Sequence, residues 1–260
     1  MNNNPLFSLI TCTYNSEKYL MECLDSVSDQ TFLDYEHIFI DGFSTDNTLA
    51  LLKRYQAKKK SQVRIYPAKA RGIGHAMNEG IKKAKGRYLI HLHSDDSFYD
   101  KNALRDVATF WQKHSDLDWI YGQIHVVEAD GSSFGFFPTR WILQRAWKYL
   151  LKYFNFIPHQ AVFIKKDVFT KYGYFKEVYK SMMDQELWLR INYLTNWGYI
   201  DRVISNYRIH RDAQSSSRDN SESIRAEHDK IQIQYLDNKL EKLIAYFIRS
   251  LESRMNKTIR

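Results

Sequence analysis

The sequence has only two cysteines, Cys12 and Cys23, and no uninterrupted run of eighteen or more apolar residues. Two cysteines cannot build a disulfide framework or a four-cysteine zinc site, and both fall inside apolar patterns, so we expect reduced, packed thiols. No transmembrane helix is predicted, and no charged-then-apolar leader precedes the first strand. We therefore expect the protein in the cytoplasm.

The sequence also lacks recognisable helix-turn-helix, zinc-finger and RNA-binding motifs. Lysine and arginine outnumber aspartate and glutamate by 38 to 30, which gives a formal net charge of +8. This excess favours anionic partners such as phosphates or an acidic membrane surface. Because the motifs are missing, we expect no nucleic-acid partner.

Short apolar runs alternate with helical patterns over the first hundred residues. Strands are predicted at 6–15, 35–42, 62–67 and 87–96, and helices at 16–30, 47–60 and 72–86, where apolar residues recur three and four positions apart. The βαβαβαβ order predicts an α/β fold with a mostly parallel sheet flanked by helices. Ligands of such sheets bind at the carboxyl ends of the strands.

Polar residues follow each of these predicted strands. They are Thr11, Thr13, Tyr14 and Asn15 after the first, Asp41 after the second, Arg71 after the third, and Ser94, Asp95 and Asp96 after the fourth. Each group alone is also ordinary turn or helix-cap chemistry. Their convergence on one edge of the sheet predicts a nucleotide site.

The stretch "HLHSDDSFYD" places two carboxylates, Asp95 and Asp96, directly behind an apolar strand. Adjacent like charges repel unless water screens them, a partner neutralises them or a cation binds between them. The stretch alone leaves two interpretations open, a metal site and a turn with a helix cap.

Five ordered segments carry a family resemblance: "SLITCTYNSEKYLMECLDSV", "IFIDGFSTDNT", "GIGHAMNEGIKKAKGRYLIHLHSDD", "HQAVFIKKDVF" and "MMDQELWLRI". Over roughly residues 6 to 210 the chain resembles the inverting family 2 glycosyltransferases of the GT-A fold, and most of all bacterial enzymes that assemble cell-surface polysaccharides. The resemblance implies a GT-A catalytic domain at 1–218, with a nucleotide-binding half at about 1–100 and an acceptor half at about 101–218. From the helical periodicity of the last stretch we expect residues 219–260 to be a helical C-terminal extension.

The resemblance also implies roles for individual residues. Asp96 would ligate a divalent cation, Mg²⁺ or Mn²⁺, with His210 near the metal or diphosphate. Asp184 would be the general base, with Glu186 as the fallback, and His159 and Gln160 would lie in the acceptor or donor-sugar region. The expected nucleotide-sugar-binding residues are Thr11, Tyr14, Asn15, Glu17, Asp41, Arg71, Asn78, Ser94 and Asp95.

The resemblance implies that a sugar moves from a nucleotide donor, expected to be UDP-linked, to a saccharide or polyprenyl-linked acceptor in a metal-assisted single displacement with inversion. The sequence departs from the family in "PAKARGIG", where Ala70 replaces a frequent acid and Gly74–His75 replaces an aromatic–acid pair. Donor identity and catalytic competence therefore stay open. One alternative is an inactive sugar-nucleotide-binding protein. Another is a nucleotidyltransferase, although "TCTYNSEKYL" has no glycine-rich phosphate loop.

The second half is predicted to contain a helix at 101–114 and two strands within 117–137 that turn at Asp130–Gly131. Residues 139–156 are aromatic and basic, which predicts either a helix that touches the inner face of the membrane or a core helix with a basic exposed side. Asp184 lies at or near a helix start, so an N-cap role is the alternative to catalysis.

Overall fold

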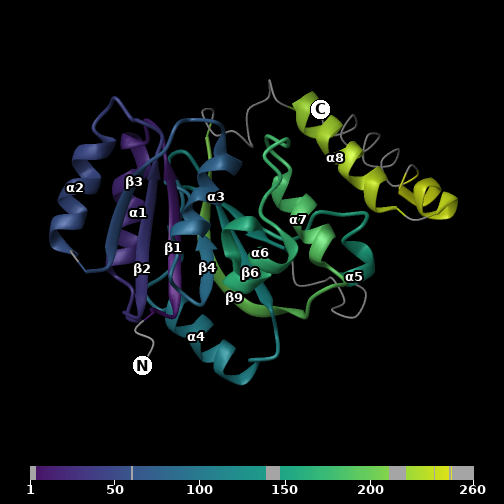
Figure 1. Ribbon diagram of the computed structural model, residues 1–260, viewed down its shortest axis with the longest axis horizontal. Helices are drawn as coiled ribbons and strands as arrows, with labels where there is room; N and C mark the ends of the chain where they lie inside the picture. The colour runs from purple at the N-terminus through teal and green to yellow at the C-terminus, as the bar shows by residue number, and fades with distance from the viewer. Residues whose placement is uncertain are drawn as a thin grey trace.

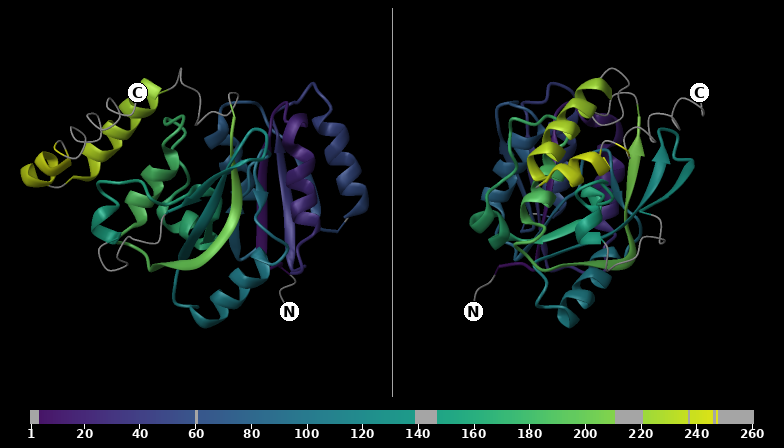
Figure 2. Two further views of the ribbon diagram at one scale, coloured as in Figure 1. Left: turned by 180° about the vertical axis from the view of Figure 1, so that it is seen from behind. Right: turned by 90° about the vertical axis from the view of Figure 1, so that its right-hand side faces the viewer.

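The computed structural model describes residues 4–59, 61–138, 147–210, 221–236, 238–245 and 247. Nine strands form a single sheet in the order β3-β2-β1-β4-β8-β6-β9-β5, with β7 paired to β6. Helices flank this sheet, and α2 and α8 lie at opposite ends of the molecule (Figures 1 and 2). This arrangement confirms the predicted α/β class.

The first half of the chain forms the parallel part of the sheet. The strands are β1 (Phe7–Thr13), β2 (Tyr35–Asp41), β3 (Val63–Pro67) and β4 (Tyr88–His91), connected by α1 (Glu17–Ser28), α2 (Thr48–Lys58) and α3 (Ile73–Lys83). Every residue of β1 and β2 is buried. Strands covered on both faces read as continuous apolar runs, which is why the sequence pattern identified them.

The second half makes the sheet mixed. It adds β5 (Ser97–Phe98), α4 (Ala103–Lys113), β6 (Trp119–Glu128), β7 (Ser133–Phe137), α5 (Trp147–Leu150), the 3₁₀ turn η2 (His159–Ala161), β8 (Val162–Lys165), α6 (Lys166–Tyr172), α7 (Met183–Ile191), β9 (Trp197–Ile209) and α8 (Ser221–Tyr235). Strand β8 is antiparallel to β4 and β6, whereas β9 is parallel to β6. The predicted hairpin is present, with Gly131 at φ +87° in its turn.

Two predicted elements differ from the structure. The strand expected at 87–96 ends at His91, because β4 pairs with β1 only to that residue and the chain then turns towards β9. Of the helix expected at 139–156, residues 139–146 lie outside the described residues and only Trp147–Leu150 is helical in the rest. The Asn192 side chain donates to the Lys148 carbonyl at 2.7 Å, so a tertiary contact takes a carbonyl that a longer helix would use.

The C-terminal part is helical where the structure describes it, over α8 and over 239–245. The predicted domain boundary at 218/219 lies outside the described residues. Within the part of the chain that the structure covers, no helix is long and apolar enough to cross a membrane.

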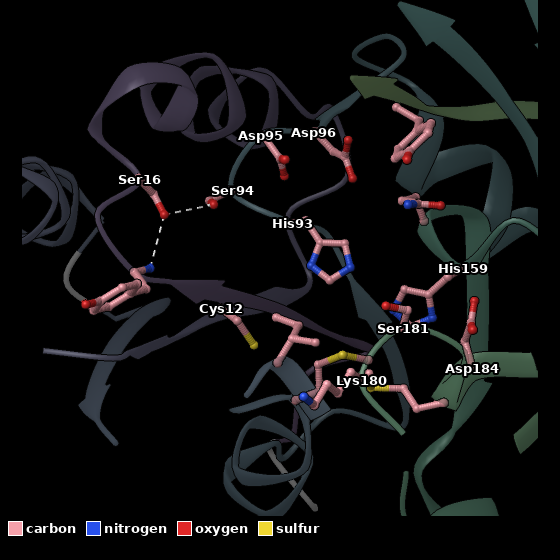
Figure 3. Close-up of a pocket in the computed structure, with 16 residues that line it drawn as sticks. Cys12, Ser16, His93, Ser94, Asp95, Asp96, His159, Lys180, Ser181 and Asp184 are labelled. Carbon is pink, nitrogen blue, oxygen red and sulfur yellow. Dashed lines mark hydrogen bonds between the residues drawn. The ribbon is translucent and has the colours of Figure 1, made fainter. Parts of the chain in front are cut away.

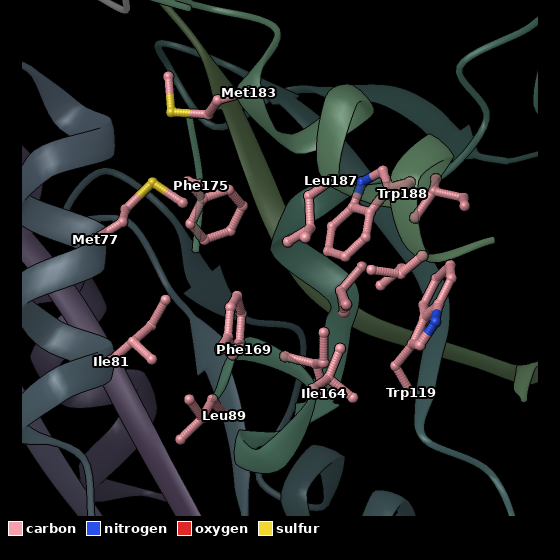
Figure 4. Packing of buried hydrophobic residues seen from close by; sticks show 14 of the residues in the cluster. Met77, Ile81, Leu89, Trp119, Ile164, Phe169, Phe175, Met183, Leu187 and Trp188 are labelled. Carbon is pink, nitrogen blue, oxygen red and sulfur yellow. The ribbon is translucent and has the colours of Figure 1, made fainter. Parts of the chain in front are cut away.

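The main core lies between the sheet and α3, α6 and α7. Met77 and Ile81 of α3 face Phe169 and Phe175 across the end of β4, as Figure 4 shows. A second cluster packs α1 and α4 on the opposite face of the sheet. The cores hold the two halves of the chain together, because each contains residues from both.

Gly86 lies at a close approach between the β4 entrance and β1. A Cβ on Gly86 would stand 2.6 Å from the carbonyl carbon of Phe7 and 2.6 Å from the amide nitrogen of Ser8. The Gly86 amide donates to Ser8 Oγ at 2.8 Å, and Ser8 Oγ in turn donates to the buried carboxylate of Glu36 at 2.7 Å. Only glycine fits here, since both crowding atoms belong to backbone.

We expect Gly86→Ala to lower the free energy of unfolding by about 1–3 kcal/mol, the usual cost of forcing extra volume into a packed site. Urea denaturation of the variant and the wild type measures the difference. Lys101→Ala, at an exposed side chain, is the control and is expected to change stability by less than about 0.5 kcal/mol. An unchanged midpoint for Gly86→Ala would contradict the close approach.

Candidate active site

A pocket of about 310 Å³ opens at the carboxyl ends of β1 and β4, beside the segment that leads into α7. Asp95 and Asp96 point into it from one side, and Ser181 and Asp184 line the other (Figure 3). Its full lining is Cys12, Tyr14, Ser16, Ile73, Met77, His93, Ser94, Asp95, Asp96, His159, Gln160, Lys180, Ser181, Met183, Asp184 and Tyr207.

Asp96 has a buried carboxylate whose two oxygens differ in their hydrogen bonding. Its Oδ1 accepts the Arg208 backbone amide at 3.0 Å, whereas its buried Oδ2 has no hydrogen-bond partner among the described residues. Burial, followed by the neighbouring charge of Asp95, raises the pKa of Asp96 well above its usual range. A bound cation would stabilise the ionised form that this environment disfavours.

Arg208 of β9 is the cation that the protein itself supplies behind the acid pair. Its side chain is buried, donates from Nε to the Asp95 carbonyl at 3.3 Å and forms an ion pair with Glu22. The guanidinium carbon also lies 4.9 Å from the centre of the Tyr19 ring. Arg208 thus fixes the backbone of the acid pair, a role that sequence reasoning missed because β9 lies more than a hundred residues away.

His210 contacts Asp95 directly. Its Nε2 lies 2.9 Å from Asp95 Oδ2, and its ring packs 4.8 Å from the ring of Tyr19. The predicted metal-proximal histidine is therefore beside the acid pair, although its Nε2 faces a carboxylate in this conformation.

Asp184 lies in the first turn of α7, at the second helical residue. The N-cap position belongs to Met182, and Asp184 Oδ1 accepts the amide of Gln185 at 2.7 Å. The N-cap alternative for Asp184 is therefore wrong. Burial raises the pKa of Asp184 to about 6, against the lowering effect of the Gln185 hydrogen bond.

Two imidazoles lie between the acid pair and Asp184 (Figure 3). The rings of His93 and His159 are 5.4 Å apart, and both residues line the pocket. Burial lowers the pKa of His159 well below its usual range, and neither of its ring nitrogens has a partner among the described residues. A neutral imidazole in this place can donate one hydrogen bond and accept another from a bound hydroxyl or phosphate.

Several predicted donor residues lie in the loops that follow β1 and β2. Asp41 is buried and accepts the hydroxyls of Thr13 and Ser44 at 2.9 and 2.6 Å. Asn15 accepts the Thr45 amide at 2.9 Å through its side chain, and Glu17 accepts the Asn47 amide at 2.9 Å. These contacts join the two loops, and none of these three predicted residues lines the pocket. Tyr14, 62% exposed, lines its edge.

The remaining predicted residues also lie outside the pocket lining. Thr11 is fully buried and donates to the Leu92 carbonyl at 2.7 Å, Asn78 is bonded to Phe175, and Arg71 is exposed.

Glu186, the fallback base, is fully buried and bonded to Arg190, Lys176 and Tyr235. Burial would raise the pKa of Glu186, but these three hydrogen bonds outweigh it and lower the pKa. The geometry therefore favours Asp184 over Glu186 as the carboxylate available to a substrate.

The pocket contains residues that sequence reasoning did not identify. These are Cys12, Ser16, Ile73, Met77, His93, Lys180, Ser181, Met183 and Tyr207. Ser16, Ile73 and His93 lie within the quoted segments, so proximity to a strand end was the available signal. Lys180 and Tyr207 carried no signal, because only the fold brings their segments to the strand ends.

The described residues contain no cluster of three or more histidine, cysteine or acidic side chains arranged for a metal ion. A cation that also binds a diphosphate needs few protein ligands, since phosphate oxygens and water complete its shell. The buried, unpartnered Oδ2 of Asp96 fits such a site, with Asp95 beside it.

The profile of the family "Glycosyl transferase family 2" matches residues 8–173. The chain belongs to this family. It is 31% identical over 186 residues to a PGL/p-HBAD biosynthesis glycosyltransferase of Mycobacterium bovis, covering 72% of this chain and 69% of that protein.

Solved structures show that the glycosyltransferase has the GT-A fold. Staphylococcus aureus TarS 1–349 in complex with UDP-GlcNAc matches with a TM-score of 0.65 and 23% identity, over 88% of this chain and 71% of that one. The mannosyltransferase PcManGT from Pyrobaculum calidifontis, in complex with GDP-Man and Mn²⁺, matches with a TM-score of 0.67 and 15% identity, over 95% and 69%. These likenesses confirm the fold that the sequence predicted.

We expect Asp184→Asn to stabilise the protein above pH 6. The pKa of the Asp184 carboxyl rises from 3.8 to about 6 on folding. The free energy of unfolding therefore falls as the pH increases through that window, by at most about 3 kcal/mol. Asparagine has no charge to bury, so its advantage is full above pH 6 and disappears between about pH 6 and 4. Urea denaturation at pH 7.5 and pH 4.5 measures it, with the exposed Asp116→Asn as control. An equal effect at both pH values would contradict a raised pKa.

Proposed function

We propose that this family 2 glycosyltransferase moves a sugar from a nucleotide donor to a saccharide or polyprenyl-linked acceptor with inversion, in a single metal-assisted displacement. The observation that carries the proposal is one pocket with an acid pair on one side and a half-buried carboxylate, Asp184, on the other. Inversion requires this arrangement, because the base must stand opposite the departing diphosphate.

The donor's diphosphate belongs at the acid pair. The unpartnered Oδ2 of Asp96 is the atom that would hold a divalent cation, with Asp95 beside it and His210 orienting Asp95 through the 2.9 Å contact. A Mg²⁺ or Mn²⁺ ion held by these residues would supply positive charge against that of the departing diphosphate. Ser94, on the same loop, lines the pocket next to these acids.

The nucleoside belongs over the loops after β1 and β2. Tyr14 offers an exposed ring there, and the Asp41–Ser44 contact fixes the loop that follows β2. A uracil or another base could stack on such a ring. We propose a UDP-linked donor, as in the TarS complex with UDP-GlcNAc, while PcManGT in complex with GDP-Man makes GDP the alternative.

The acceptor hydroxyl belongs next to Asp184. Its carboxylate would take the hydroxyl proton as the oxygen attacks the anomeric carbon, and a pKa of about 6 leaves it ionised at neutral pH and still a useful base. His93, His159 and Gln160 line the space between Asp184 and the acid pair, where the transferred sugar would lie. Their nitrogens and oxygens suit sugar hydroxyls.

Two variants separate the donor site from the base. We expect Asp96→Asn to lose most of the Mn²⁺-dependent increase in nucleotide affinity, because it removes the charge that would hold the cation. Asp184→Asn should bind nucleotide as the wild type does and transfer sugar at least about a hundredfold more slowly. Calorimetric titration with UDP, GDP and dTDP, each with and without Mn²⁺, measures the first effect. Release of nucleotide from UDP-GlcNAc or GDP-mannose measures the second.

Each outcome tests a different part of the proposal. Metal-independent nucleotide binding in the wild type would contradict the cation site. Full turnover by Asp184→Asn would contradict the base. Nucleotide binding without turnover of any donor or acceptor would instead support the inactive sugar-nucleotide-binding alternative.

We also propose peripheral contact with an anionic membrane surface, through the helical residues 239–245 and 247. Leu240, Leu243, Ile244 and Phe247 recur at helical spacing and are 65%, 51%, 39% and 57% exposed. The exposed charged side chains of this segment are lysines, Lys239 and Lys242, and Glu241 is paired with Lys152 at 3.2 Å. A helix with an apolar stripe and basic flanks suits the interface of an anionic bilayer.

The double variant Leu240→Ser, Leu243→Ser should lose binding to vesicles of phosphatidylcholine mixed with phosphatidylglycerol, because it removes half of the apolar stripe. Cosedimentation with those vesicles, and with phosphatidylcholine alone, measures the effect. Ile233→Ser, exposed on α8 outside the stripe, is the control and should bind as the wild type does. The proposal would be contradicted if the wild-type protein bound neither kind of vesicle. It would also be contradicted if this stripe formed a dimer interface instead.

A further inference from the structure

Helix α8, which lies beyond the residues matched by the family profile, contacts the segment that enters α7. One carboxylate makes the contact. Glu227 accepts the backbone amides of Lys180 at 2.8 Å, Ser181 at 2.9 Å and Met182 at 3.2 Å. Three consecutive amides thus converge on the two oxygens of a single side chain.

This carboxylate binds the amide of the α7 N-cap residue and the two amides that precede it. Met182 is the N-cap residue of α7, and its thioether side chain makes no capping hydrogen bond. Amides at a helix start need acceptors from outside the helix, and a negative charge there is also favoured by the helix dipole. Glu227, from another element of the fold, supplies an acceptor for the Met182 amide and a negative charge beside the helix start.

The segment held in this way forms one wall of the pocket. Lys180, Ser181, Met183 and Asp184 all line it, opposite the acid pair (Figure 3). Glu227 therefore bonds to the backbone two to four residues before the proposed base.

Other contacts join α8 to the same region. The hydroxyl of Tyr235 donates to Glu186 at 2.6 Å, and Tyr179 donates to Gln234 at 3.4 Å. Glu186 is two residues after Asp184, and Tyr179 is one residue before Lys180. Helix α8 thus bonds to the chain on both sides of Asp184, and Figure 1 shows α7 and α8 as neighbours.

We propose that Glu227 is a positioning residue for glycosyl transfer, acting through the amides of residues 180–182 to hold Asp184 at the pocket. The inference rests on the proposed role of Asp184. It assigns the C-terminal extension a part in the active site, because a base displaced by about 1 Å can cost a hundredfold in rate.

The test compares Glu227→Ala, Glu227→Gln and Glu241→Ala in the full chain. We expect Glu227→Ala to release nucleotide from UDP-GlcNAc, or from GDP-mannose if the titration selects GDP, about ten- to a hundredfold more slowly. Glutamine keeps one acceptor oxygen, so Glu227→Gln should fall between Ala and wild type. Glu241→Ala removes a glutamate of the same extension that is paired with Lys152, and it should keep the wild-type rate.

Two further measurements separate positioning from loss of structure. Mn²⁺-dependent nucleotide affinity should stay within about twofold in both Glu227 variants, because the acid pair is held by Arg208 and not by α8. Hydrogen exchange of amides 180–182 should be faster in Glu227→Ala than in Glu241→Ala.

The failures are distinguishable. Wild-type turnover by Glu227→Ala, with Asp184→Asn inactive, overturns this inference alone. Turnover by Asp184→Asn overturns the proposed base itself. Equal loss of nucleotide affinity and rate in both Glu227 variants would show a general structural defect and would also contradict the positioning role.

Discussion

The site depends on keeping two adjacent carboxylates at the end of a buried strand. Asp95 and Asp96 would repel each other in a dry environment, and burial raises the pKa of Asp96 accordingly. Arg208 offsets this cost with a backbone amide to one acid and a guanidinium behind the other. Because Arg208 comes from β9, the acid pair gains these contacts only when the second half of the sheet packs against the first.

The opposite wall of the pocket is also held by hydrogen bonds to a residue distant in the sequence. Its amides, from Lys180 to Met182, are bonded to Glu227 of α8. A buried cation from β9 therefore holds the acids, and a carboxylate from α8 holds the segment of Asp184. Each charge is opposite in sign to the group it bonds, because amides present partial positive charge and the Asp95 carbonyl oxygen presents partial negative charge.

The sequence predicted the elements whose signals are local. Strands β1 to β4 are runs of apolar residues, and the polar residues at their ends mark the binding edge, so Asp95, Asp96 and Tyr14 were found from position alone. The family resemblance identified Asp184. Arg208 and Glu227 could not be found in this way, since a basic residue in a strand and an acid in a helix are common and only pairing across the fold distinguishes them.

The predicted donor residues that lie outside the pocket also show what sequence alone cannot determine. Asn15 and Asp41 stand at strand ends as expected, and Glu17 begins α1. The side chains of Asn15 and Glu17 nevertheless bond to the loop after β2, and Asp41 bonds to Thr13 of β1 and to Ser44 of its own loop. A sequence motif indicates that a polar side chain is needed at a position. It does not distinguish a side chain that contacts a ligand from one that stabilises the loop. Here those side chains hold the loops after β1 and β2 together, and the exposed ring of Tyr14 lies on the paired loops. The proposed nucleoside surface thus results from loop pairing, and its shape depends on contacts some thirty residues apart in the chain.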